Sequence, residues 1–106
     1  MKPARLRPRA KDDLSDQAWF YAQKAGIAVA DNFVDQALAA LTTVELQPGL
    51  GSPHWSEEAA HPALRAWRVS RFPMVWFYFE RTDHLDVVRL LGERQDIATI
   101  LRVDLA

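Results

Sequence analysis

The run MVWFYFE, residues 74–80, constrains the fold more than any other segment of the chain. Its aromatic and β-branched side chains favour a strand, in which successive side chains point to opposite faces. An antiparallel strand in a small protein commonly has one apolar face and one polar face. This strand is apolar on both faces, so a fold that contains it has to cover both. One face carries Met74, Trp76 and Tyr78, and the other carries Val75, Phe77 and Phe79.

The composition is that of an ordinary globular protein. The chain has 106 residues, of which 49% are hydrophobic and 25% charged, and these values fit a single domain over 1–106. Cysteine is absent, which excludes disulfides and thiolate metal sites and is typical of a cytoplasmic protein. No apolar run approaches the roughly 20 residues that span a bilayer, and the basic N-terminus lacks a secretory signal. We therefore expect a cytoplasmic protein, whose net charge of −1 provides no overall attraction to nucleic acid.

The N-terminal half predicts a short strand followed by two helices. Residues 4–7 form the strand, and Pro8 suits the first turn of the helix that follows. Gly26 is expected to end this helix as a left-handed cap, with the second helix starting at about Ala28. So short a connection requires the helices to fold back as an antiparallel hairpin. The apolar stripes comprise Leu14, Ala18 and Tyr21 in the first helix and Phe33, Ala37, Leu41 and Val44 in the second.

The C-terminal half predicts an antiparallel meander. The turn sequence PGLGSP at 48–53 ends the second helix, and a polar loop follows at 54–62. Strands are expected at 64–69, 74–80 and 85–91, with a short helix or tail around Ile97, Ile100 and Leu101. The predicted fold is α+β in the order β-α-α-β-β-β, with the helical hairpin packed on one face of a small antiparallel sheet.

The side chains of residues 74–80 indicate which face meets the hairpin. Val75, Phe77 and Phe79 have no polar atom to satisfy, so we expect them beneath the helices. Trp76 and Tyr78 combine an apolar body with a polar tip, which suits a partly wet groove or an interface. An exposed aromatic face is a binding surface for a partner. The alternative is that the C-terminal tail or a second copy of the chain covers it.

Several segments together carry a resemblance to a known family. They are RLRPRAKDDL at 5–14, the spacing of Gly26, Ala30 and Phe33, LQPGLGSP at 46–53, the step Arg71-Phe72-Pro73, and RLLGERQD at 89–96. In this order and at this length, the chain resembles the RelE/ParE superfamily of toxins from bacterial type II toxin–antitoxin systems, and its ParE branch most closely. The resemblance implies a groove on the sheet in which the C-terminal segment of a ParD-like antitoxin lies. The predicted groove residues for antitoxin or target are Arg68, Met74, Trp76, Tyr78, Arg89 and Arg94.

The resemblance leaves two toxic activities to weigh. RelE-like members cleave mRNA on the ribosome, whereas ParE-like members poison DNA gyrase by trapping the cleaved complex. RNA cleavage needs groups that move protons and stabilise charge on the phosphate. Met74 stands where a RelE-like groove arginine would stand, and Ile100 lies at or near the position of a RelE-like tyrosine. We therefore predict no catalytic residues and no cofactor, and a toxin that inhibits DNA gyrase or a related topoisomerase by binding. The alternatives are a ribosome-dependent mRNA endonuclease and a decayed toxin that only binds its antitoxin.

The charged residues near the C-terminus depart from the ParE pattern. Many relatives have a histidine, a glycine and two arginines before an aspartate, whereas residues 92–96 read GERQD. The arginines at 68, 89 and 94 either pair with an acidic antitoxin or target, or make surface ion pairs with Glu80, Asp86 or Asp96. His54, His61 and His84 lie in loops without the spacing of a metal site, so no metal is expected.

Overall fold

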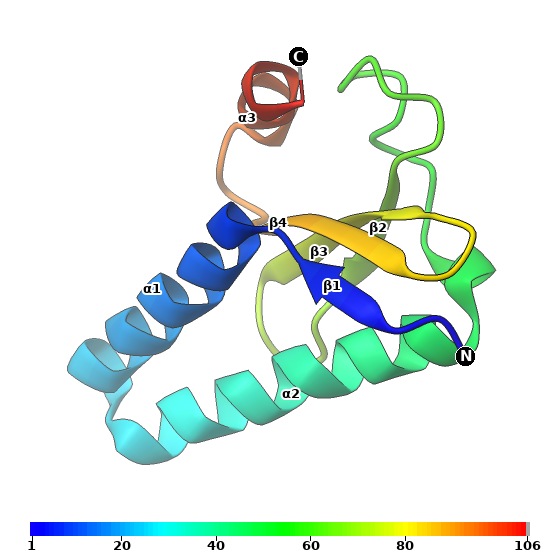
Figure 1. Ribbon diagram of the computed structural model, residues 1–106. Helices are drawn as coiled ribbons and strands as arrows, with labels where there is room; N and C mark the ends of the chain where they lie inside the picture. The colour runs from blue at the N-terminus through cyan, green and yellow to red at the C-terminus, as the bar shows by residue number, and fades with distance from the viewer. Residues whose placement is uncertain (106) are drawn as a thin grey trace.

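The computed structural model describes residues 1–105, which fold into a sheet with helices on both sides (Figure 1). The element order is the predicted one, and the terminal segment forms a helix. Within 1–105, no helix is both long and apolar enough to cross a membrane. The elements are β1 (Ala4–Leu6), α1 (Pro8–Ala25), α2 (Ile27–Leu46), a 3-10 turn (Pro48–Leu50), β2 (Arg65–Arg68), β3 (Met74–Glu80), β4 (Leu85–Gly92) and α3 (Ile97–Asp104).

The sheet is mixed, with the strand order β1-β4-β3-β2. The predicted antiparallel meander is confirmed, because β2 pairs with β3 and β3 with β4 in antiparallel fashion. β1 runs parallel to β4, with Ala4 opposite Leu85 and Leu6 opposite Val87, so the expectation of a wholly antiparallel sheet was wrong. A strand as short as β1 has no side-chain pattern from which its direction can be predicted.

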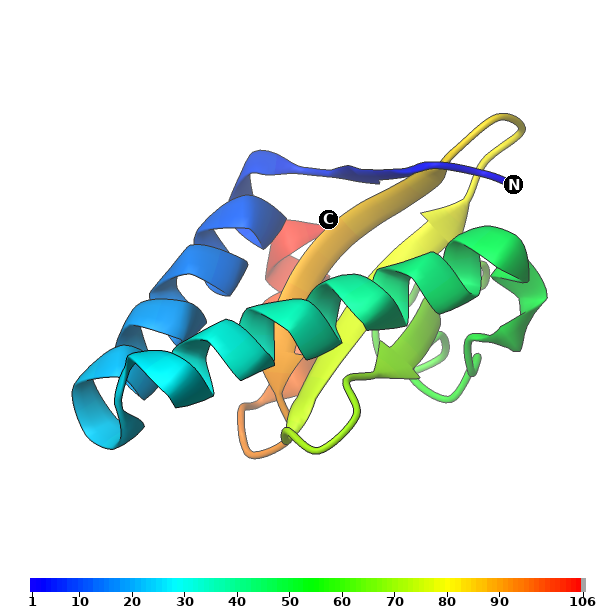
Figure 2. The same ribbon diagram turned by 90° about the horizontal axis from the view of Figure 1, so that it is seen from below.

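Gly26 alone connects the two long helices. Its N–H donates to the Ala22 carbonyl at the end of α1, and its carbonyl accepts from Ala30 in α2. The φ angle is 95°, a value that favours glycine, but the ψ angle of 166° lies outside the left-handed helical region that we expected. The hairpin is therefore tighter than predicted, and α1 and α2 together lie against one side of the sheet (Figure 2).

The face of β3 that packs against the hairpin is the one we expected to face a groove. Trp76 and Tyr78 are fully buried, and both belong to the core cluster that contains Phe33 and Ala37 of α2. The Trp76 indole N–H donates to the Ala37 carbonyl (2.9 Å). A helical carbonyl has a second lone pair that can accept such a bond, so the polar tip needs no water. Our assignment of Met74, Trp76 and Tyr78 to an exposed groove was wrong, because all three are buried in the core between the sheet and the hairpin.

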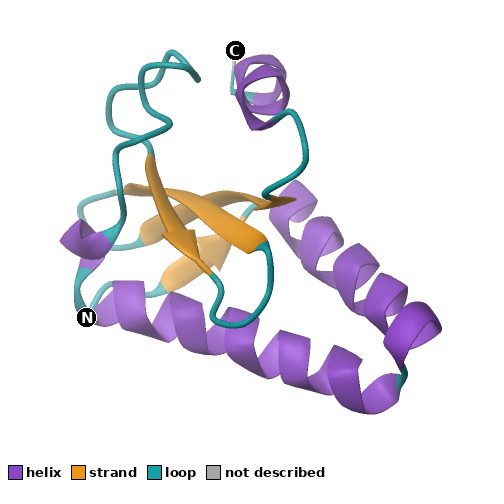
Figure 3. Ribbon diagram, turned by 180° about the vertical axis from the view of Figure 1, so that it is seen from behind, coloured by secondary structure: helices purple, strands orange, loops and turns teal. Residues whose placement is uncertain are grey.

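The opposite face of β3 is covered by the chain itself. Phe77 is fully buried and Phe79 nearly so, in a second cluster with Leu64 and with Ile97 and Leu101 of α3. Figure 3 shows α3 on the side of the sheet away from α2. The tail is therefore what covers the second face, which is the alternative that the sequence left open.

Tyr78 also anchors the turn that follows α2. Its hydroxyl donates to the Pro48 carbonyl (2.7 Å) and accepts from the Gly51 N–H (3.0 Å). Burial raises the pKa of Tyr78, which keeps the hydroxyl protonated and able to donate. The turn sequence at 48–53 is thereby fixed against the sheet.

Replacing Gly51 by alanine is expected to destabilise the protein by about 1–3 kcal/mol, as overpacking does. A Cβ atom at Gly51 would lie 2.2 Å from the Tyr78 hydroxyl oxygen and 2.9 Å from the Arg65 Cβ. Gly49→Ala is the matched control, because a Cβ there meets no atom within 4 Å. Urea unfolding measures both variants, and equal midpoints for the two would contradict the predicted clash.

Candidate functional site

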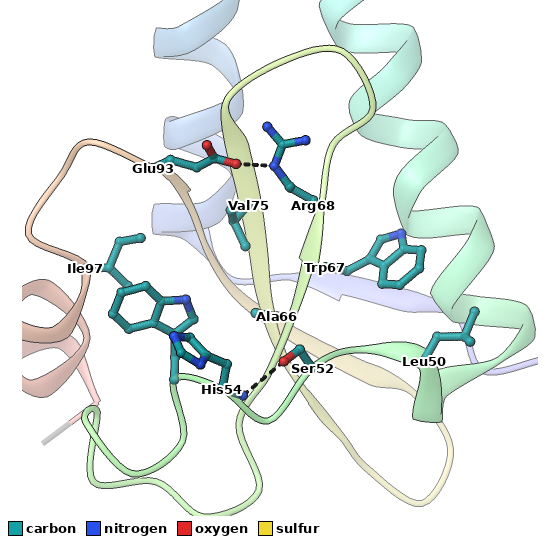
Figure 4. Close-up of a pocket in the computed structure, with 10 residues that line it drawn as sticks. Leu50, Ser52, His54, Ala66, Trp67, Arg68, Val75, Glu93 and Ile97 are labelled. Carbon is teal, nitrogen blue, oxygen red and sulfur yellow. Dashed lines mark hydrogen bonds and ion pairs between the residues drawn. The ribbon is translucent and has the colours of Figure 1, made fainter.

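A pocket of about 430 Å³ lies between the edge strand β2, the segment at 50–55 and the start of α3 (Figure 4). Three structural elements that are distant in sequence meet there, which is typical of a binding surface. The lining residues are Leu50, Ser52, His54, Trp55, Ala66, Trp67, Arg68, Val75, Glu93 and Ile97.

The pairing of β2 with β3 decides where Arg68 lies. Arg68 is opposite Val75, and Trp67 is opposite Trp76. Opposite residues in an antiparallel pair share a face, so Arg68 lies on the α3 side of the sheet and not beside Trp76 as we predicted. A register one residue different would have reversed this outcome.

Arg68 forms an ion pair with Glu93 at one end of the pocket (Figure 4). The side chains are 60% and 38% exposed, so water screens the pair and its contribution to stability is small. Glu93 is the glutamate by which this chain departs from the ParE pattern, and it makes the bond from the turn after β4. The pair is therefore available for exchange with the charges of a partner.

The outer edge of β2 is only partly occupied. Ala66 exchanges both main-chain hydrogen bonds with Ser52 (2.8 Å each). Along a strand every second residue points its N–H and C=O to the same side, so those of Arg68 also point outward. β2 is the last strand of the sheet, and this edge borders the pocket. Another extended segment can pair there.

Arg89 is a buried structural residue and does not line the pocket. Its side chain is 10% exposed, and its guanidinium donates twice to the Asp13 carboxylate of α1 (2.7 and 2.9 Å). It also pairs with Asp104 of α3, while Asp13 accepts from the Leu90 N–H as well. These hydrogen bonds raise the pKa of Arg89, so it stays charged. The predicted surface roles of Arg89, in a groove or with Glu80, Asp86 or Asp96, were wrong.

Arg94 is exposed in the turn between β4 and α3, and no ion pair forms with it inside 1–105. Its role toward a partner stays a prediction, as does that of Arg68.

Two positions are relevant to RNA cleavage. Met74 is buried, and Ile100 is half-buried on α3.

The histidines lie apart from one another. His54 lines the pocket with its ring 5.2 Å from that of Trp55, His61 lies against Phe79, and His84 contacts Asp83. Over the described range, no three metal-ligating side chains cluster.

Sequence reasoning missed the contribution of the segment at 50–55 to this site. We predicted a polar loop at 54–62, yet Leu50 and Trp55 form apolar walls of the pocket. The signal was present, because large apolar residues stand on both sides of the turn, Leu50 directly before Gly51 and Trp55 two residues after Pro53. Burial of such side chains is favourable, so a loop that carries them is expected to pack them against a neighbouring element.

Comparison with known proteins identifies the family. The model of a family described as "ParE toxin of type II toxin-antitoxin system, parDE" matches residues 4–103. The chain belongs to the ParE toxin family. A solved structure titled "Chromosomal ParDE TA system from P. aeruginosa" is similar in fold, with a TM-score of 0.73 and 17% identity. The similarity covers 87% of this chain and 96% of that one. A search of curated proteins found no match.

Several ParE-like segments turn out to determine the fold. Phe72 of the Arg71-Phe72-Pro73 step is buried, and its ring lies 5.2 Å from those of both Tyr21 and Phe33. Asp13, in the opening segment, binds Arg89 in the closing one. The resemblance in this ParE-family chain therefore rests largely on residues that hold the hairpin, the sheet and α3 together.

Proposed function

We propose that this chain is the toxin of a type II toxin–antitoxin pair, neutralised in the cytoplasm by a ParD-like antitoxin. Free of antitoxin, it inhibits DNA gyrase, or a related topoisomerase, by binding and trapping the cleaved complex. The match of residues 4–103 to the ParE toxin family is the observation that carries this proposal. Inhibition by binding needs only a surface, which accords with apolar side chains at Met74 and Ile100.

The antitoxin docks at the β2 edge in this proposal. An extended peptide that adds to a sheet edge gains main-chain hydrogen bonds, and side-chain pockets supply specificity. The outward-pointing main-chain N–H and C=O of Arg68 offer the hydrogen bonds, and the 430 Å³ pocket beside them accepts an apolar side chain. An acidic antitoxin residue then replaces Glu93 as the partner of Arg68.

A supercoiling assay tests the activity, with purified antitoxin-free protein, gyrase, relaxed DNA and ATP. An in-vitro translation reaction is run in parallel. We expect loss of supercoiling, accumulation of cleaved DNA and normal translation. Cut mRNA with unaffected gyrase would show a ribosome-dependent endonuclease instead. Normal behaviour of both reactions would leave a protein that only binds its antitoxin.

Arg68→Glu is expected to weaken antitoxin binding at least tenfold, on the order of 1.4 kcal/mol. The substitution places two carboxylates at the end of the pocket and repels an acidic antitoxin residue. Arg5→Glu is the matched control, because Arg5 is an exposed arginine on β1, at the opposite edge of the sheet. Calorimetric titration of antitoxin into each variant measures the difference. Equal affinities would move the antitoxin site away from the β2 edge.

A further inference from the structure

We propose that two adjacent turns at one end of the sheet bind the phosphate backbone of DNA. The turns are 70–73, between β2 and β3, and 93–96, between β4 and α3; together they are called the turn end. Arg71 and Arg94 are the contacting residues. The inference rests on the proposed function, because the DNA in question is the duplex held by gyrase.

The two turns are joined by backbone contacts. The Glu93 N–H donates to the Pro73 carbonyl (3.0 Å), and Met74 pairs with Gly92 at the adjoining strand ends. Figure 2 shows the turns side by side, in yellow-green and orange, at the same end of the sheet. Arg71 is two residues from Pro73, and Arg94 follows Glu93 directly. The two arginines therefore lie on one continuous surface.

Both turns are internally held, so the arginines are presented from ordered backbone. The Val69 N–H donates to the Met74 carbonyl across the first turn, and buried Phe72 anchors its tip. In the second turn, the Gln95 side-chain oxygen accepts from the Gly92 N–H (2.6 Å). Preorganised groups lose less freedom when they bind a ligand.

The carboxylates of the turn end already have partners. Glu93 pairs with Arg68, and Asp96 accepts from the Thr99 N–H and hydroxyl as the cap of α3. Arg71 and Arg94 are exposed, and neither forms an ion pair inside the described residues 1–105. Counted with Arg68, which pairs with Glu93, the turn end has three arginines against two carboxylates, a local charge of +1 in a chain whose net charge is −1.

The backbone of Arg71 shows that the residue type is not required by the turn. Its φ angle is 71°, in the left-handed region that suits glycine or asparagine better. Such strained positions concentrate at functional sites. The feature that arginine adds here is an exposed cationic side chain, on the residue that precedes the buried Phe72.

Phosphate fits this surface better than an acidic protein does. Protein interfaces are centred on large apolar or aromatic anchors, and the exposed ones in this chain lie outside both turns. The guanidinium is matched to phosphate in its planar, two-pronged geometry. The two carboxylates of the turn end are engaged, Glu93 by Arg68 and Asp96 by the first turn of α3. Other exposed carboxylates, such as Asp12 and Asp31, lie on α1 and α2, outside both turns.

Titration of the antitoxin-free protein with a short duplex at low salt, followed by amide NMR shifts, tests the site. We expect shifts confined to 70–73 and 93–96, and a salt dependence with a slope of roughly −1.8, from about −0.9 for each of two phosphates. The variant Arg71→Asn/Arg94→Gln should lose this binding, and asparagine tolerates the positive φ. Lys11→Gln/Lys24→Gln removes two exposed cations from α1 and should bind as the unaltered chain does.

Shifts located elsewhere, an unchanged slope in the arginine variant, or equal binding of poly-glutamate would overturn the phosphate site. The supercoiling assay separates this inference from the proposed function. In that assay the arginine variant should inhibit gyrase at least tenfold less, at unchanged antitoxin affinity. Full inhibition by the variant contradicts the phosphate site alone. Unaltered protein that binds DNA at the turn end but leaves gyrase unaffected supports the site and contradicts the proposed function.

Discussion

Arg89→Met is expected to destabilise the protein by about 3–5 kcal/mol, the usual cost of removing one partner from a buried ion pair. The substitution removes the cation that Asp13 and Asp104 share, whose carboxylates are 16% and 13% exposed. Within the described residues 1–105, Asp104 then keeps only the exposed Arg9, at 3.8 Å, and Asp13 keeps no cation. Because Asp13 and Asp104 lie on α1 and α3, the loss of their shared cation also loosens the attachment of both helices to β4. Urea unfolding followed by far-UV circular dichroism measures the loss.

A variant in which both carboxylates are also neutralised separates two causes of the stability loss: the lost attraction of the ion pairs and the burial of unpaired carboxylates. In Arg89→Met/Asp13→Asn/Asp104→Leu no buried charge remains, and the asparagine oxygen can still accept from the Leu90 N–H. We expect this variant to regain more than half of the lost stability, because buried ion pairs are commonly replaceable by neutral side chains. A single Arg89→Met variant of unchanged stability would show that the cluster is hydrated.

Trp76→Ala is expected to cost about 3–5 kcal/mol, the range typical of a large aromatic removed from a core. Trp76 is fully buried between the sheet and α2, and its indole N–H bonds to Ala37. Trp67→Ala is the matched control, since Trp67 is directly opposite Trp76 on the half-buried edge strand β2 and should cost much less. The difference in unfolding free energy between the variants is the measurement. Both side chains lie on the face that packs against α2, so equal costs would contradict our account that Trp76 is central to this core and Trp67 marginal.

Local sequence patterns were sufficient for most of the elements. The bounds of β3 are those predicted, because a strand of aromatic and β-branched residues between two turn sequences has few alternatives. Pro8 begins α1 and Gly26 separates α1 from α2, since proline and glycine restrict or release the backbone at the residue itself. The resemblance to ParE toxins, read from short segments along the chain, is confirmed by the family match.

The candidate site was predictable only in part. Arg68 does lie at the pocket, but on the opposite face from the one predicted, and the walls from 50–55 were missed. Arg89 could not be placed by alternation, because the pairing of β3 with β4 shifts between Phe77 and Tyr78. A bulge of this kind breaks the two-residue period on which such predictions rest.

The sequence by itself determined the elements, their order and the two apolar faces of β3, because these follow from the backbone preferences and periodicity of neighbouring residues. Only the tertiary structure decided which face of β3 packs against the hairpin and that β1 is parallel to β4. It likewise decided that Arg89 joins α1 to α3. The physical reason is that these outcomes depend on partners distant in the chain. The carbonyl that accepts from Trp76 is 39 residues away from it in sequence, and Asp13 is 76 residues from Arg89.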